Sequence, residues 1–175
     1  MSTPHEPDPA LLIVALLWQP PVRLEQIVTR LEQEFGPCDA RSPAFDFTQT
    51  TYYEPEMGAG LTRCYLSFER FVSPGSLPDI KLATNAIEAH AFTANARRSV
   101  NIDPGIVTGH SLILATGKDF SHRVYVRDGI YEEVSLIVRG GSLQPLEWTY
   151  RDYRTPLALA FFEECRQRFL RRRRS

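Results

Sequence analysis

The sequence predicts an α+β protein with a ferredoxin-like β-α-β-β-α-β core, extended by a β-hairpin and a C-terminal helix. Up to residue 103, segments typical of strands and helices follow one another in that core order. A strong hairpin signal and an amphipathic helix come after them. The 175 residues suit a single domain. We place this domain at 11–170, between a disordered Pro-rich lead-in at 1–10 and a basic tail at 171–175.

The first strand and helix are marked by apolar patterns with clear ends. Residues 10–18, "ALLIVALLW", form an uninterrupted apolar segment with the length of a buried strand. Pro20-Pro21 ends this segment and places a proline near the start of a helix. Apolar residues then recur at helical spacing over 24–35, until Gly36-Pro37 ends the pattern.

A hairpin and a second helix are expected next. Residues 41–53 and 60–72 are rich in Phe, Tyr, Thr and Val, which favour strands, and a short loop separates them. Ser76 and Asp79 have the spacing of a capping box at the start of a helix. This helix carries one apolar face, and we expect it to end near Arg97.

One further strand completes the core, and a hairpin follows it. We expect the strand at 99–103. Residues 104–115 fit either a helix or a strand, and a short helix is favoured because Asp-Pro is a good helix opening. Asp128-Gly129, between strand-like segments at 122–127 and 130–138, is typical of a two-residue type I′ turn.

The chain ends in an amphipathic helix, and its overall composition is that of a globular protein. Leu157, Phe161, Phe162, Cys165 and Phe169 form the apolar stripe of this helix. The net charge of -1 gives no bulk electrostatic reason to expect a charged partner. No apolar run is long enough to span a bilayer. The sequence therefore predicts a cytoplasmic protein without a membrane partner.

The two-residue turn determines which side chains of the hairpin share a face. With residues directly opposed across the strands, Arg123 and Glu132 are diagonal neighbours within reach of an ion pair. His122 and Glu133 then fall on the opposite face. The charges of this hairpin are therefore either a ladder of surface ion pairs or one wall of a site.

Three further stretches combine aromatic rings with charges, at residues 50–60, 97–105 and 147–154. Tyrosine and tryptophan are costly to leave exposed. Mixed with carboxylates and arginines, they are typical of a pocket whose ligand has both flat and charged parts. We expect these stretches and residues 114–136 to line one pocket. The alternative is that the aromatic rings only anchor long loops.

Several short strings occur in an order that resembles a known family. They are "YYEPEMG", "LSFE", "NIDPG", "KDFSHR", "DGIYEEVSL" and "WTYRDYR". Together, over about Leu11 to Arg166, they resemble a bacterial family of uncharacterised proteins, the domain of unknown function numbered four-four-one-six. The resemblance marks polar and aromatic positions without assigning them roles. These positions are Tyr53, Glu54, Glu56, Asn101, Asp103, Lys118, Asp119, His122, Arg123, Glu132, Trp148, Tyr150 and Asp152.

The basic residues before the hairpin suggest a clamp for an anion. Lys118, His122 and Arg123 lie within six residues of one another. Arginine can offer a carboxylate or phosphate two parallel N–H donors, and lysine adds a point charge. The sequence contains neither a G-x-x-x-x-G-K-[ST] loop nor an N-K-x-D string, so a phosphate-loop nucleotide site is not predicted.

Two kinds of chemistry remain open for the same region. His122 with Glu56, Asp103 or Asp119 could form an acid–base pair that works near neutral pH. Alternatively, Glu54, Glu56, Asp103 and His122 could hold Mg²⁺ or Mn²⁺. We assign no metal site, and the sequence specifies no cofactor.

The sequence thus predicts a protein that binds a small anion bearing a phosphate or carboxylate, with acid–base catalysis left open. The alternatives are a nucleic-acid binder that uses the sheet and the basic tail, and a non-enzymatic partner-binding protein. The oligomeric state is not specified. The candidate catalytic residues are His122, Glu56 and Asp103. The candidate ligand-binding residues are Tyr53, Glu54, Asn101, Lys118, Asp119, Arg123, Glu132, Trp148, Tyr150 and Asp152.

Overall fold

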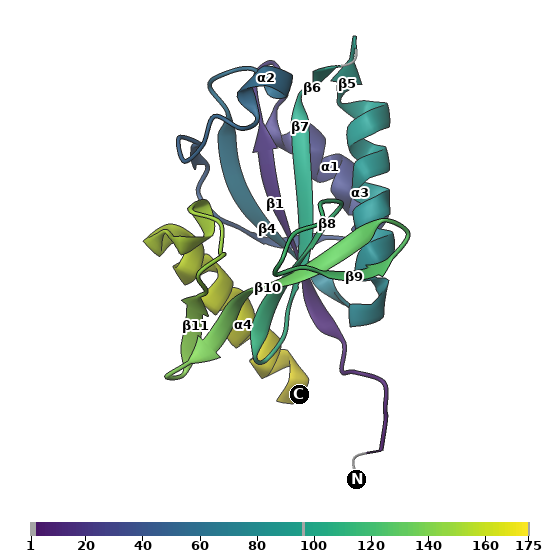
Figure 1. Cartoon of the computed structure of the whole chain (residues 1–175), viewed down its shortest axis with the longest axis vertical. Helices are drawn as coiled ribbons and strands as arrows, with labels where there is room; N and C mark the ends of the chain where they lie inside the picture. Colours follow the sequence, from purple (N-terminus) through teal and green to yellow (C-terminus); the bar gives the residue numbers. More distant parts are fainter. Residues whose placement is uncertain (1–2, 96, 175) are drawn as a thin grey trace.

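The computed structural model describes residues 3–95 and 97–174, in which helices and antiparallel strands form an α+β fold (Figure 1). Two 3₁₀ turns, η1 (Pro74–Ser76) and η2 (Asp152–Arg154), precede the third and fourth helices. No helix in the described part of the chain is long and apolar enough to cross a membrane. The helices are α1 (Leu24–Phe35), α2 (Glu54–Met57), α3 (Leu77–Ala91) and α4 (Pro156–Arg174).

Antiparallel pairing joins most of the described strands into one sheet. The strands of this sheet are β1 (Ala10–Trp18), β2 (Cys38–Arg41), β3 (Phe45–Asp46), β4 (Thr62–Val72), β7 (Val100–Val107), β8 (Ser111–Thr116), β9 (Val124–Arg127), β10 (Ile130–Arg139) and β11 (Ser142–Pro145). The order along the sheet is β11-β10-β8-β7-β1-β4-β2, with β3 paired to β4 and β9 paired to β10. The short strands β5 (Thr93–Ala94) and β6 (Arg97–Arg98) pair separately.

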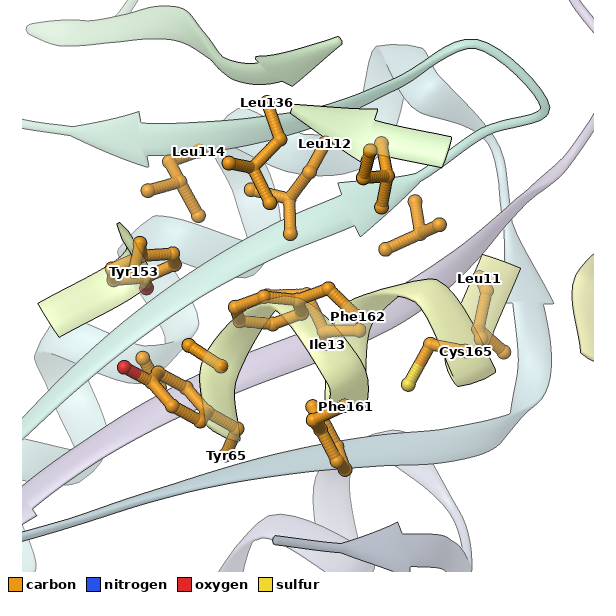
Figure 2. Close-up of a cluster of buried hydrophobic side chains, with 14 of the residues drawn as sticks. Leu11, Ile13, Tyr65, Leu112, Leu114, Leu136, Tyr153, Phe161, Phe162 and Cys165 are labelled. Atoms are coloured by element: carbon orange, nitrogen blue, oxygen red, sulfur yellow. The ribbon is translucent and has the colours of Figure 1, made fainter. Parts of the chain in front are cut away.

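Helices cover both faces of the sheet because its central strand is apolar on both. Leu12 and Val14 of β1 belong to a core that includes residues of α1 and α3. Leu11 and Ile13 belong to a second core on the opposite face, where α4 packs. Figure 2 shows this second core, with Phe162 of α4 close to the strand. The uninterrupted apolar run therefore forms a strand that is buried on both sides, as expected.

The elements with the clearest local patterns are confirmed. The positions of β1 and α1 match the predicted ranges, α4 packs its predicted apolar stripe into the core, and β9 and β10 meet at the predicted turn. Asp128 and Gly129 both have positive φ angles, 52° and 75°, as a type I′ turn requires. The helix α4 continues to Arg174, so most of the expected basic tail is helical. Residues 3–9 lack regular structure; residues 1, 2 and 175, on which parts of the lead-in and tail fall, lie outside the described residues.

The prediction of one continuous strand at 41–53, as the first strand of a hairpin with 60–72, is wrong. The second strand exists as β4, but Pro43 separates the short strands β2 and β3 from each other. Pro55 then lies at the start of α2. Proline has no amide hydrogen for a sheet ladder and suits the first turn of a helix, which explains both interruptions.

The capping box expected at the start of α3 does not form. The Ser76 hydroxyl donates to the Ser73 carbonyl (2.7 Å) and makes no cap bond to the helix. Asp79 pairs instead with Arg127, the last residue of β9 before the turn of the β9–β10 hairpin. The helix ends at Ala91, earlier than expected, because the chain turns there into the β5–β6 pair.

The short helix favoured for residues 104–115 is also wrong, because these residues continue the sheet. β7 runs to Val107, and a tight turn closed by the Thr108 amide donating to Ser111 O (2.9 Å) leads into β8. Pairing with β1 along the whole of β7 outweighs the local preference of Asp-Pro for a helix start. The strand assignment lengthens the predicted strand at 99–103 into β7 and adds β8 beside it.

A fork between β7 and β8 creates the space for the site. The two strands pair only through Gly105–Val107 and Leu112–Leu114, and they separate on the side of Asp103 and Thr116. A Cβ atom at Gly105 would lie 2.6 Å from the Ile113 carbonyl oxygen, so only glycine permits this close approach. The neighbouring Pro104 has no amide hydrogen to extend the ladder.

The predicted register of the β9–β10 hairpin needs one correction. Arg127 faces Ile130 as expected, but Tyr131 then faces Tyr125, so Val126 forms a bulge. The bulge shifts the rest of β9 by one residue. The expected neighbours Arg123 and Glu132 therefore separate, and the next carboxylate along β10 takes the place of Glu132.

Candidate functional site

A hollow of about 260 Å³ lies in the fork between β7 and β8. Asn101 and Asp103 line it from β7, and Thr116 and Lys118 line it from the end of β8. Arg63 reaches it from β4, two strands away from β7. We call this space the inner hollow, and most of its named lining is charged or carries hydrogen-bond donors.

A larger hollow of about 730 Å³ adjoins the first. Its lining is richer in aromatic rings, which include Phe47, Tyr52 and Trp148. We call it the outer hollow. Both hollows share one set of lining residues, which we call the junction: Tyr53, Arg63, Lys118 and Tyr150.

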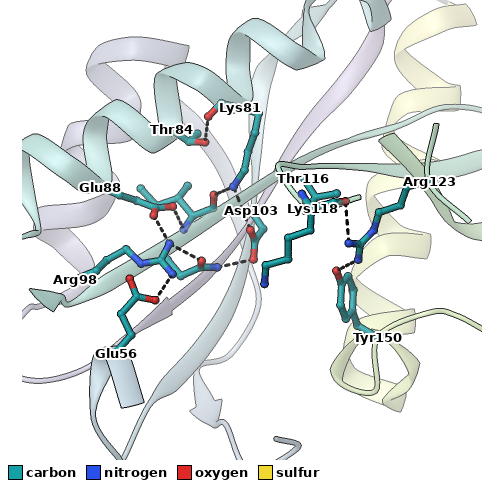
Figure 3. A network of polar contacts seen from close by, with 12 residues as sticks. Glu56, Lys81, Thr84, Glu88, Arg98, Asp103, Thr116, Lys118, Arg123 and Tyr150 are labelled. Atoms are coloured by element: carbon teal, nitrogen blue, oxygen red, sulfur yellow. Dashed lines mark hydrogen bonds and ion pairs between the residues drawn. The ribbon is translucent and has the colours of Figure 1, made fainter. Parts of the chain in front are cut away.

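Arg98 organises the side of the inner hollow that faces α2 and α3 (Figure 3). Its guanidinium pairs with Glu56 (Nη2 to Oε2, 2.9 Å) and with Glu88 (Nη1 to Oε2, 2.5 Å), and donates to Asn101 Oδ1 (2.9 Å). Burial raises the pKa of the Glu88 carboxyl above its ordinary value. Two carboxylates therefore neutralise Arg98, which leaves this cation little capacity to hold an added anion.

Asp103 lies at the centre of the same network. It accepts hydrogen bonds from Asn101 Nδ2 (2.5 Å) and from Lys81 Nζ (3.2 Å). Burial alone would raise the pKa of this carboxyl, but the charges of Lys81 and Arg63 and the two hydrogen bonds lower it below its ordinary value. Asp103 is therefore an ionised carboxylate at neutral pH, which disfavours a role as a general acid.

Arg63 is a buried cation with unused hydrogen-bond donors. Its Nη2 pairs with Asp152 Oδ2 at 2.9 Å, and the two side chains are only 4% and 5% exposed. Its Nε and Nη1 are buried and have no hydrogen-bond partner within residues 3–95 and 97–174. Burial would lower the pKa of this guanidinium, but Asp152 and nearby phenols raise it above its ordinary value, so Arg63 is charged. Unpartnered buried donors cost about 1–3 kcal/mol, and here they belong to a residue that lines both hollows.

Three phenol groups add neutral donors beside Arg63. Tyr53 and Tyr150 belong to the junction. Tyr153 lines the inner hollow, and its buried hydroxyl has no hydrogen-bond partner in the described part of the chain. Burial raises the pKa of all three phenols, to about 12 for Tyr150, so they stay protonated at neutral pH. The Tyr150 oxygen accepts a hydrogen bond from Arg123 (2.6 Å), which leaves its own O–H available as a donor.

Arg123 and His122 do not form the expected clamp, because both contact Glu133. Arg123 Nε donates to Glu133 Oε2 (2.8 Å), and its other nitrogens donate to Lys118 O (3.1 Å) and to the Tyr150 hydroxyl. His122 Nε2 lies 3.2 Å from the same oxygen of Glu133. These contacts hold the loop before β9 against β10, so Arg123 positions two members of the junction.

Lys118 differs from the two other residues of the expected clamp. In the described part of the chain, its Nζ makes no ion pair and no hydrogen bond. The ammonium lies 4.1 Å from the ring centroid of Tyr52 and 5.9 Å from that of Tyr53. Figure 3 shows the side chain extending from the end of β8 into the region of the network. Lys118 is therefore the exposed cation of the junction that has no carboxylate partner.

The structure brings most of the candidate ligand-binding residues to the two hollows. Glu54 and Asp119 are exposed and line neither hollow. Glu132 lines neither, because strand alternation turns it to the face opposite Glu133. The candidates that line at least one hollow are Tyr53, Asn101, Asp103, Lys118, Arg123, Trp148, Tyr150 and Asp152.

Two of the three candidate catalytic residues, Glu56 and Asp103, belong to one network joined through Arg98 and Asn101, and His122 lies apart from it. Glu56 pairs with Arg98, Asp103 with Lys81, and His122 with Glu133. The carboxylate that contacts His122 is Glu133, and the pairing of His122 with Glu56, Asp103 or Asp119 stays a prediction. Within residues 3–95 and 97–174, no three His, Cys, Asp or Glu side chains are arranged to hold a metal ion.

Several important residues were missed because they interrupt apolar patterns. Arg63 lies in β4 two positions before the buried Tyr65, and so on the same face of the strand. Lys81 and Glu88 lie on α3 next to its buried isoleucines and are themselves buried. A charge inside an apolar stripe is the signal that could have identified them, because buried charges require partners.

The family comparison agrees with the resemblance in the sequence. The family model described as "Domain of unknown function (DUF4416)" matches residues 8–169. No curated protein and no solved structure matches the chain. The matched range contains both hollows and every strand of the large sheet. The chain therefore belongs to the DUF4416 family.

Proposed function

We propose that this protein binds a small anion, a phosphate or carboxylate group, at the junction of the two hollows. The observation that carries the proposal is Arg63, a buried cation whose Nε and Nη1 have no hydrogen-bond partner among the described residues. Buried donors are nearly always paired in folded proteins, so an unpaired set on a residue that lines both hollows favours a ligand that accepts hydrogen bonds. Arginine suits this role because phosphate and carboxylate oxygens match its planar fork.

The rest of the junction has matching chemistry. Lys118 adds a second positive charge without a carboxylate partner, and Tyr53 and Tyr150 add protonated hydroxyl groups. Asp152 occupies one nitrogen of Arg63 and balances only one of the two charges. An anion bound here would complete the hydrogen bonds of Arg63 and meet Lys118.

The proposal concerns binding and includes no chemical step. His122 lies apart from the network that contains Glu56 and Asp103, and each of the three already contacts a charged side chain. The nucleic-acid alternative has less support, because helices cover both faces of the central strands on which bases would stack.

We also propose that β1, α1, β2, β4, α3 and β7 form a ferredoxin-like core. The support is the strand order β7-β1-β4-β2 with antiparallel neighbours, together with α1 and α3 packed in one hydrophobic cluster. In this description β8, β10 and β11 extend the core beyond β7, and the fork at the site is where that extension begins.

Lys118→Ala is the gentlest test of the anion site. Lys118 is exposed and its ammonium has no ion pair, so we expect the free energy of unfolding to change little. Loss of a charge-assisted contact should weaken phosphate binding by about tenfold or more. The measurement is the rise in melting temperature with sodium phosphate, compared with sodium chloride at the same ionic strength.

Arg139→Ala provides a control for the loss of one positive charge. Arg139 is exposed at the far end of β10 and lines neither hollow. It should keep the response of the wild type to phosphate. Equal responses in all three proteins would contradict a role for Lys118, and the absence of any response to phosphate or acetate in the wild type would contradict the anion site.

A further inference from the structure

The outer hollow is larger than a phosphate or carboxylate group needs. Its volume is about 730 Å³, against about 260 Å³ for the inner hollow. The junction separates the two spaces, so a ligand whose anionic group binds there still has room on the outer side. The residues that border this room indicate what kind of group would fill it.

The indole of Trp148 is a fixed, partly exposed surface of the outer hollow. Its Nε1 donates to the Val134 carbonyl (2.8 Å), and its ring stacks on His122 with a centroid separation of 5.4 Å and an interplanar angle of 15°. His122 is held in turn by Glu133. Trp148 nevertheless remains 40% exposed. His122 does not line the hollow, so the part of the indole that borders it is not the part stacked on the imidazole.

Tyr52 and Tyr53 supply further aromatic surface near the junction. Their rings lie 5.1 Å apart at 88°, and Tyr52 is 61% exposed. Lys118 lies over Tyr52 and also lines the inner hollow, so it connects the aromatic surface with the anion site. A planar group in the outer hollow would thus contact aromatic rings in the same hollow that Arg63 and Lys118 line.

We propose that the ligand is an anion that carries a planar ring, with the anionic group at the junction and the ring in the outer hollow against Trp148 and Tyr52. This inference rests on the proposed anion site and adds the class of molecule that fills it. A flat group gains most from rigid aromatic surfaces, because no side chain has to be ordered when it binds. Ring-bearing phosphates and ring-bearing carboxylates share this chemistry.

Matched pairs of small probes test the ring and the anion separately. Phenyl phosphate is compared with methyl phosphate, and phenylacetate with acetate, by calorimetric titration of the full chain. We expect the ring to improve the affinity of the preferred anion by about tenfold. The stronger of the two pairs identifies the anion as phosphate or carboxylate. Phenol, which has the ring without the strong anion, should bind far more weakly than either ring-bearing anion.

Trp148→Leu should remove the advantage of the ring and leave the affinity for methyl phosphate unchanged. Tyr125→Leu is the matched control, because Tyr125 is 58% exposed and lines neither hollow. This control should keep the full advantage of the ring. Tyr52→Leu replaces Trp148→Leu if loss of the indole disturbs the fold, since Tyr52 is more exposed.

The possible results separate the two proposals. Methyl phosphate or acetate binding without any gain from the ring would overturn the ring inference and leave the anion site standing. A gain that survives both Trp148→Leu and Tyr52→Leu would also overturn it. No binding of any of the four anions, or phenol binding as tightly as phenyl phosphate, would overturn the anion site itself.

Discussion

Arg63→Met is expected to abolish the response to phosphate and to lower the free energy of unfolding by about 3–5 kcal/mol. The substitution removes the cation with the unpartnered N–H groups. It leaves the carboxylate of Asp152 buried, and among the described residues only the Tyr65 hydroxyl, at 3.3 Å, still donates to it. An unpaired buried charge is costly because the protein cannot replace its hydration. Chemical denaturation and phosphate titration of the purified variant measure the two effects.

A double variant separates the stability effect from the binding effect. Replacing both partners, Arg63→Met with Asp152→Leu, removes the buried charges together, which is often neutral for stability. We expect this protein to recover most of the lost free energy of unfolding and still fail to bind phosphate. Normal phosphate binding by the double variant would show that Arg63 is a structural ion-pair residue and nothing more.

Asp152→Asn should have the second largest effect. It should lower the free energy of unfolding of the unliganded protein and increase the response to phosphate. The variant leaves Arg63 buried without its counter-ion, so the unliganded protein should lose about 3 kcal/mol of unfolding free energy. A phosphate at the junction would then supply the missing negative charge. The rise in melting temperature caused by phosphate should therefore be larger in Asp152→Asn than in the wild type.

The direction of that change in phosphate response is the informative part. Asp152 could instead affect phosphate binding by a route that does not involve Arg63. In that case, the change in phosphate response caused by Asp152→Asn would be the same with and without Arg63. Combining Asp152→Asn with Arg63→Met should therefore remove the enhanced response. A smaller phosphate response in Asp152→Asn than in the wild type would contradict the role given to Arg63.

The sequence predicts correctly those elements whose conformation depends on residues close together in the chain. The apolar run of β1 and the Asp128-Gly129 turn each specify their structure within a few residues. Residues 104–115 were misassigned because pairing of β7 with β1 and β8 decides their conformation, and that pairing depends on distant parts of the chain. The bulge at Val126 likewise has no sequence signal of its own, yet it exchanges Glu132 for Glu133 as the partner of Arg123.

In the candidate site too, features set by neighbouring residues are predictable and features set by distant contacts are not. The aromatic and charged loops were recognisable, and Tyr53, Lys118 and Tyr150 do meet at the junction. Arg63 was overlooked because a single charge in an apolar strand resembles a solvent-facing residue until the opposite face is known to be covered by α4. Sequence reasoning also treated Lys118, His122 and Arg123 alike, whereas a buried carboxylate, Glu133, engages two of them.

The most direct test of the account is the position of a heavy anion in crystals of the protein. Tungstate resembles phosphate in shape and charge, and its anomalous scattering identifies it without ambiguity. The account predicts a tungstate ion at the junction, within hydrogen-bonding distance of Arg63 Nε or Nη1 and near Lys118 Nζ. Crystals soaked to saturation with tungstate that show no ion beside Arg63, or an ion only at exposed arginines elsewhere, would contradict it.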